Sequence, residues 1–166
     1  GWCRGTQTAG FTATDSTSGF DVSGTSPSDF TKDTTTNGAG VSIASGSVQD
    51  YAGNDASSID AGPFKIDSVK PVITLRPAAD SCDVPGDHGW CRGTQTAGFT
   101  ATDATSGFAP SGDLSLDFTQ SSATNGTAVQ VTSGTQTDLA GNVADAIDAG
   151  PFMIDSVAPS LAARSA

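Results

Sequence analysis

The sequence GWCRGTQTAGFTATDATSGF at Gly89–Phe108 decides how this chain is organised, because it occurs twice. The copy at Gly1–Phe20 differs at one position, where Ser16 stands in place of Ala104. The two copies align without a gap at an offset of 88 residues, from position 1 to position 89. A repeat of this length is too long for one layer of a solenoid and matches a whole small β-sandwich domain.

Two further motifs keep the same offset and place the repeat frame on the chain. They are DxAGN at 50–54 and 138–142, and IDAGPF at 59–64 and 147–152. The frame is displaced from the chain ends, so we expect one complete repeat and two partial ones. The expected divisions are a repeat lacking its first strand at 1–67, a linker at 68–70, a complete repeat at 71–155, and a linker with the first strand of a following repeat at 156–166.

Short apolar clusters rich in β-branched residues recur between turn signals such as Thr-Ser-Gly and Thr-Asn-Gly. This pattern is typical of short strands, and no helical period is present. We therefore predict an all-β fold with antiparallel pairing. In the complete repeat, strands are expected at 72–76, 92–102, 114–119, 127–137 and 150–154, with a further strand starting near Phe108 and a bulge at Ser133–Gly134.

The composition excludes some classes of partner. All 18 acidic residues are Asp, and the net charge is −11 with only seven basic residues. Nucleic-acid binding needs clustered Lys and Arg, so we expect no nucleic-acid partner. A membrane helix needs about 20 apolar residues, and the sequence contains no such stretch, so we expect no membrane insertion in this segment.

The order of three motifs resembles a known family. FTATDATSGF, TSGTQTDLAGN and GPFMIDSVAP, in that order, resemble the bacterial immunoglobulin-like tandem repeats of large secreted surface and adhesin-type proteins. The resemblance covers nearly the whole chain and implies tandem Ig-like antiparallel β-sandwich domains at an extracellular or cell-surface location. It also implies a role in cell adhesion, with neighbouring copies of the same repeat as partners, covalent or non-covalent.

The cysteines indicate a disulfide. Cys82 and Cys91 flank the turn sequence DVPGDHGW, and a bond between them would close a short loop between the first two strands of the repeat. The alternative is three free thiols in a reduced protein, but the composition favours an oxidising compartment. Cys3 is the counterpart of Cys91, so we expect its partner to be a cysteine outside this chain.

The family resemblance also suggests a metal site. In an Ig-like sandwich, the loops that hold Asp103 and Asp138 lie at one end of the domain, where the linker brings in Asp67. Carboxylates gathered in this way could bind calcium, which takes oxygen ligands. The equivalent junctions would use Asp15 and Asp50, and Asp155. The alternative is that these aspartates only hydrogen-bond to the backbone of their own turns.

The leading functional hypothesis is a structural repeat of an extracellular fibre, stalk or adhesin. One alternative is a filament subunit that polymerises by donating a β-strand from residues 159–166, with Pro159, Leu161 and Ala163 in the donated segment. Another is a carbohydrate-binding accessory module. We do not expect an enzyme, because the aspartates recur in turns of both copies. The only histidine is His88, whose counterpart in the first repeat would precede residue 1, and we expect it to be an exposed loop residue.

Overall fold

The computed structural model describes residues 1–164, which are mostly β-strand in antiparallel sheets, so the all-β prediction is confirmed. The chain forms two compact units, and each is described by itself. Unit 1 contains Gly1–Lys70 together with Asp103–Leu114 and Asp138–Asn142. Unit 2 contains the other described residues. Two loops that belong to the second repeat by sequence are thus part of unit 1.

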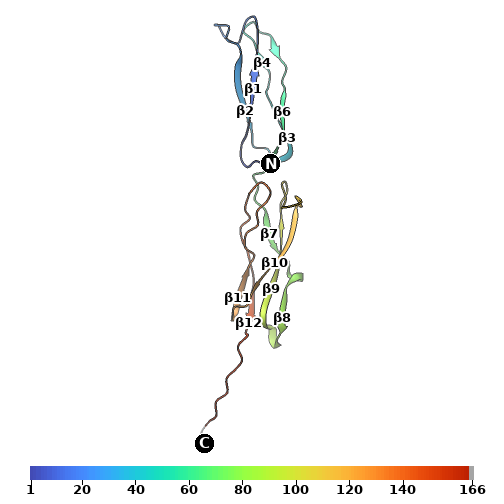
Figure 1. The fold of residues 1–166 in the computed structure, drawn as a ribbon, viewed down its shortest axis with the longest axis vertical. Coiled ribbons are helices and arrows are strands. Elements are labelled where there is room, and N and C mark those ends of the chain that lie inside the picture. The colour runs from blue at the N-terminus through green and yellow to red at the C-terminus, as the bar shows by residue number, and fades with distance from the viewer. Residues whose placement is uncertain (165–166) are drawn as a thin grey trace. The chain divides into compact units, whose positions relative to one another are not determined.

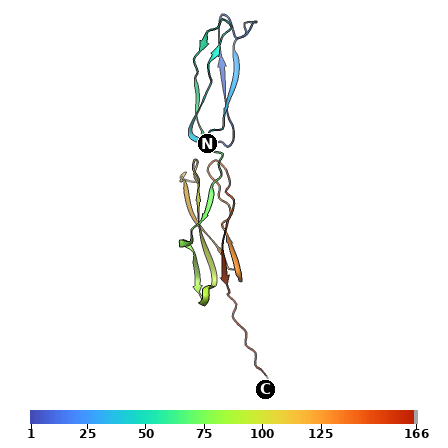
Figure 2. The same cartoon turned by 180° about the vertical axis from the view of Figure 1, so that it is seen from behind.

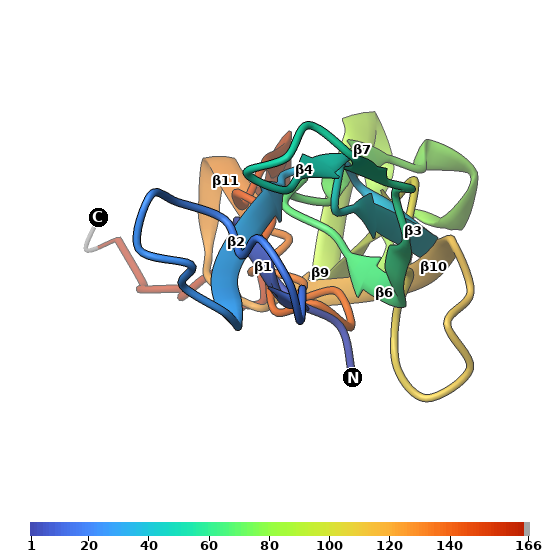
Figure 3. The same ribbon diagram turned by 90° about the horizontal axis from the view of Figure 1, so that it is seen from above.

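Unit 1 is built from antiparallel strand pairs (Figure 3). Its strands are β1 (Gln7–Ala13) with β2 (Ser28–Thr34), β3 (Gly38–Ala44) with β6 (Asp60–Ile66), and the short β4 (Val48–Gln49) with β5 (Asp55–Ala56).

Alternation along the strands produces the core of unit 1. Ala9 and Phe11 of β1 are buried while their neighbours are exposed, as expected for a strand with one covered face. They cluster with the buried Ile43 of β3. Phe30 of β2 stacks on Phe11 with 5.6 Å between ring centroids, and the half-buried Phe64 of β6 closes the cluster. The β1–β2 and β3–β6 pairs therefore contribute to one shared apolar core.

Unit 2 is organised around one long strand, β9 (Trp90–Thr102) (Figures 1 and 2). Its antiparallel neighbours are β10 (Ser115–Ser122), β7 (Val72–Leu75) and β8 (Ser81–Pro85). A second antiparallel pair, β11 (Gly126–Thr132) with β12 (Asp148–Ile154), joins β9 through a short parallel contact at Trp90 and Cys91. The prediction of antiparallel sheets is confirmed, and short parallel contacts accompany them here and between Cys3 and Ile66 in unit 1.

Three strand predictions need correction. Near Phe108 the chain makes only an isolated bridge to Asp113, and Pro110 between them has no N–H to donate to a ladder. The strand expected to run on to residue 137 ends at Thr132, because Gly134 at φ 69° turns the chain. The register shifts lie earlier, within Gly126–Val131, and not at Ser133–Gly134.

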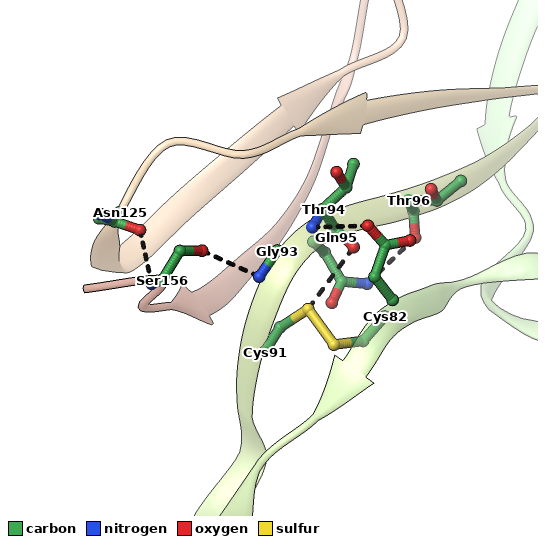
Figure 4. Close-up of a disulfide and its surroundings, with 9 residues drawn as sticks. Cys82, Cys91, Gly93, Thr94, Gln95, Thr96, Asn125 and Ser156 are labelled. Atoms are coloured by element: carbon green, nitrogen blue, oxygen red, sulfur yellow. Dashed lines mark hydrogen bonds between the residues drawn. A yellow bond between two sulfur atoms is a disulfide. The ribbon is translucent and has the colours of Figure 1, made fainter. Parts of the chain in front are cut away.

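The predicted disulfide between Cys82 and Cys91 is present (Figure 4). It joins β8 to β9 with 5.7 Å between the two Cα atoms. The segment between the cysteines, expected to be a plain loop, is mostly strand pairing with a 3-10 turn at Asp87–Gly89, and a second such turn at Pro77–Ala79 precedes it. The disulfide packs against the buried Ile154 and Val129.

Cys3 is half-buried and has no disulfide partner among residues 1–164. Its pairing with a cysteine outside the chain stays a prediction.

Removing the disulfide is expected to destabilise unit 2. In the variant Cys82→Ser with Cys91→Ser, the unfolded chain gains conformational entropy, because the loop between positions that are nine residues apart is no longer closed. The expected loss is on the order of 2–3 kcal/mol of unfolding free energy, measured by denaturant titration. Cys3→Ser is the matched control, and it should change the unfolding free energy much less. Equal losses in the two proteins would contradict the assignment.

Candidate metal centre

Three of the six predicted carboxylates lie together in unit 1. One side-chain oxygen from each of Asp67, Asp103 and Asp138 lies within 4.8 Å of the other two. All three residues are buried, and Asp67 is fully inaccessible at 0% exposure. They come from the end of β6 and from two loops of the second sequence repeat, so segments far apart in the chain meet at this cluster.

The turn D-A-T-S-G fixes the first carboxylate. Asp103 Oδ1 accepts hydrogen bonds from the backbone N–H groups of Thr105 (3.0 Å) and Gly107 (2.7 Å). Gly107 has φ 70°, and a Cβ there would lie 2.3 Å from the backbone of Gly112, so only glycine fits. The other oxygen, Asp103 Oδ2, is buried and has no hydrogen-bond partner.

The motif D-L-A-G-N fixes the second carboxylate through Asn142. Asp138 Oδ1 accepts from the backbone N–H of Asn142 (2.8 Å), and Asp138 Oδ2 accepts from its side-chain amide (2.8 Å). The same amide nitrogen donates to the backbone carbonyl of Asp67 at 3.1 Å. Asn142 therefore holds two of the three aspartates in place.

The third carboxylate enters from the end of β6. Asp67 Oδ1 accepts from the backbone N–H of Val69 (3.1 Å), and Asp67 Oδ2 accepts from the backbone N–H of Ser106 (3.0 Å). Ser106 is 3% exposed, and its hydroxyl oxygen is buried without a hydrogen-bond partner. The cluster thus contains two buried oxygens, Asp103 Oδ2 and Ser106 Oγ, with unused bonding capacity.

The chemistry of this cluster fits a hard cation. Three buried carboxylates this close repel one another when ionised, and burial makes each charge costly. Their hydrogen-bond donors described above are backbone N–H groups and one amide, which are neutral. Arg4 donates to the carbonyl of Gly141 at 2.7 Å, which adds one positive charge beside the loop of Asp138. Calcium accepts six to eight oxygens in flexible geometry, and this oxygen-only set suits it better than zinc.

The turn hydrogen bonds that formed the alternative interpretation are also present. They occupy Asp103 Oδ1 and part of the capacity of Asp138, and they leave Asp103 Oδ2 free. Each carboxylate oxygen has two lone pairs, so a turn hydrogen bond and a metal bond can share one carboxylate. The turns therefore orient the carboxylates and do not compete with ion binding.

The equivalent aspartates of the first repeat form a pair and not a triad. The pKa of Asp15 is lowered by backbone N–H groups, Gly19 first and then Thr17. The pKa of Asp50 is also lowered, chiefly by the side chain of Asn54, although burial and the charge of Asp15 oppose this. Among residues 1–164, no third acidic side chain joins these two in a metal-sized group.

Asp155, in unit 2, belongs to no metal-sized acidic group among residues 1–164. It is exposed, and its Oδ1 accepts from the backbone N–H of Val157 at 2.9 Å. Asp67 occupies the same position in the first repeat, and its Oδ1 accepts the equivalent hydrogen bond from the backbone N–H of Val69.

The sequence did not reveal the role of the serine after each linker aspartate. Ser68 Oγ accepts from the backbone N–H of Gly5 (2.8 Å), and Ser156 Oγ accepts from that of Gly93 (2.9 Å) (Figure 4). The backbone N–H of Ser156 also donates to Asn125 Oδ1. The repeated motif IDSV was the available signal, but a serine beside a linker is typical of any turn.

Comparisons with protein-family models, curated proteins and solved structures found no match. Within residues 1–164, no helix has the length and apolar character needed to cross a membrane. The geometry described above therefore carries the functional argument.

The lowered pKa of Asp15 predicts an acid-dependent stability. The stabilisation from Asp15 is complete above its usual pKa of 3.8 and is lost as the pH falls through the lower folded value. Asp15→Asn should therefore lose less stability than the parent chain between about pH 5 and about pH 2. Denaturant titrations at each pH measure this. Asp33→Asn, at an exposed position of β2, is the control, and equal acid dependence in parent and Asp15→Asn would refute the assignment.

Proposed function

We propose that this chain is a structural segment of an extracellular bacterial fibre, stalk or adhesin, made of tandem Ig-like β-sandwich domains and stiffened by calcium. The observation that carries the proposal is the buried cluster of Asp67, Asp103 and Asp138. An ion bound by all three would tie the last strand of the first repeat to two loops of the second. Such a tie would stiffen the joint between the repeats of a stalk.

The strand arrangement supports the Ig-like part of the proposal. β9 lies between β10 and β7, while β11 and β12 form a separate antiparallel pair. In unit 1 the corresponding strand pairs share an apolar core around Phe11 and Ile43. Short antiparallel strands in two layers, within a repeat of about 85 residues, are the features of a small β-sandwich.

A structural role agrees with the way the acidic residues are used. The carboxylates of Asp103 and Asp138 are buried and held by their own turns. A catalytic carboxylate must reach a substrate, and neither residue is exposed enough to do so. His88 is exposed in the turn between β8 and β9, and in the sequence it is distant from both Asp103 and Asp138.

An extracellular location agrees with the disulfide and with the charge. A disulfide between Cys82 and Cys91 persists in oxidising compartments and is rare in the cytosol. Calcium at such sites is effective outside the cell, where modules bind it with dissociation constants of about 0.1–1 mM. The net charge of −11 also keeps long assemblies soluble and apart.

Calcium is expected to stabilise the full chain. Ligand binding to the native state adds about 2.7 kcal/mol at a hundredfold excess over the dissociation constant. Adding calcium to chelator-treated protein should therefore raise its melting temperature, and terbium luminescence should report one ion per chain. Asp67→Asn should abolish both effects, because it removes one charge from the cluster.

Asp155→Asn is the matched control, since Asp155 occupies the same repeat position but is exposed. It should keep the calcium response. A melting temperature insensitive to calcium in the parent chain would exclude the calcium site. Labelling of intact cells with antibodies against this chain tests the location separately, and an exclusively intracellular signal would exclude the fibre or stalk.

A further inference from the structure

Ser106 has a buried hydroxyl beside the aspartate cluster that no hydrogen bond accounts for. The residue is 3% exposed, and its Oγ has no hydrogen-bond partner among residues 1–164. A buried hydroxyl without a partner costs free energy, so native structures rarely keep one without a reason. The hydroxyl of Ser106 therefore indicates a bonding partner that the described part of the chain does not supply.

The backbone around Ser106 places this hydroxyl at the cluster. The N–H groups on either side of it, those of residues 105 and 107, donate to Asp103 Oδ1. The N–H of Ser106 itself donates to Asp67 Oδ2 at 3.0 Å. Ser106 therefore stands between two carboxylates of the cluster. Because the serine side chain is short, its Oγ lies near the Asp67 oxygen that the N–H binds.

The same turn in the first repeat uses its serine differently. There the N–H groups of residues 17–19 all donate to Asp15 Oδ1, at 2.7–2.9 Å. The hydroxyl of Ser18 also donates to Asp15 Oδ1, at 3.4 Å. The two turns, DSTSG and DATSG, differ only in the residue after the aspartate. The serine hydroxyl is thus released from its own turn where Asp67 supplies a third carboxylate.

A neutral oxygen suits the remaining coordination of a calcium ion at this cluster. Calcium takes six to eight oxygens. Hydrogen bonds from the turns already use part of the capacity of Asp67, Asp103 and Asp138. A further carboxylate would add repulsion to the three that are buried here. A hydroxyl oxygen has two lone pairs and no charge, so it adds a ligand without adding repulsion.

We propose that the hydroxyl of Ser106 is a direct ligand of the calcium ion, bound through Oγ alongside Asp67, Asp103 and Asp138. The ion then accounts for the two buried oxygens that lack a partner, Ser106 Oγ and Asp103 Oδ2. The proton stays on the serine and can be donated to a carboxylate while a lone pair of Oγ points to the ion. This inference rests on the proposed calcium site and adds a fourth side chain to it.

A purely structural serine would behave differently. A hydroxyl that only donates to a neighbouring carboxylate would leave the coordination of the ion unchanged. Its loss would weaken calcium binding through the shape of the turn, without changing which oxygens contact the ion. The number of water molecules on the bound ion separates the two cases, because it changes only when a direct ligand is lost.

The variant Ser106→Ala, in the full chain loaded with terbium, tests the proposal. Luminescence lifetimes in ordinary and in heavy water give the number of water molecules bound to terbium. The variant should bind one water more than the parent chain, because water is itself a ligand of such ions and takes the position of Oγ. Its calcium affinity should fall by about tenfold, the lower end of the loss seen for groups that support a metal site.

Ser18→Ala is the matched control, because it removes the equivalent serine from the turn of the first repeat. It should leave the hydration of terbium and the calcium affinity unchanged. Equal hydration of terbium in Ser106→Ala and in the parent chain would overturn the proposal and leave the calcium site standing. A parent chain that binds no terbium would instead overturn the calcium site, and this ligand with it.

A crystal structure of the unmodified chain with calcium guards against a variant that fails to fold or binds no terbium. The oxygen Ser106 Oγ should lie about 2.3–2.6 Å from the ion, the range of calcium–oxygen bonds. A water molecule between Oγ and the ion, or an ion that contacts the carboxylates and not Oγ, would overturn the proposal.

Discussion

Each β-strand offers two hydrogen-bonding edges, and in unit 2 the 13 residues of β9 are long enough to use both. β10 takes one neighbouring position, while β7 and β8 pair with successive parts of the strand. The start of β9 also carries the parallel contact to β12 and the disulfide to β8. All the strands of unit 2 are thus connected through β9, except β11, which is joined through β12.

Aspartate performs a different task at the ends of these strands. Its short side chain reaches the backbone N–H groups of its own turn, as Asp103 does with Thr105 and Gly107. A turn held in this way needs only one carboxylate oxygen, so the other can face inward. Glutamate has one more methylene and suits such turns less well, which agrees with the use of aspartate at these turns.

Much of this could be predicted from the sequence, because the repeat offset and the turn motifs are explicit. The all-β class and the bond between Cys82 and Cys91 were predicted from such patterns, whereas the grouping of Asp67, Asp103 and Asp138 was predicted from the family resemblance. β8 was missed because Ser81–Pro85 alternates poorly and contains a proline, so only its pairing with β9 makes it a strand. The part played by Ser106 was missed because a backbone N–H has no sequence signature, and its acceptor is distant in the chain.

The near-identity of the repeats sets a problem for folding itself. β1 and the part of β9 at 95–101 have the same sequence, QTAGFTA, so β7 has two equivalent acceptors during folding. The cysteines favour the correct one, because Cys82 is nine residues from Cys91 but 79 from Cys3, as 82 minus 3 gives. The entropy of loop closure favours the shorter loop by about 2 kcal/mol. A link from Cys82 to Cys91 therefore favours the pairing of β7 with β9 over pairing with the identical sequence in β1.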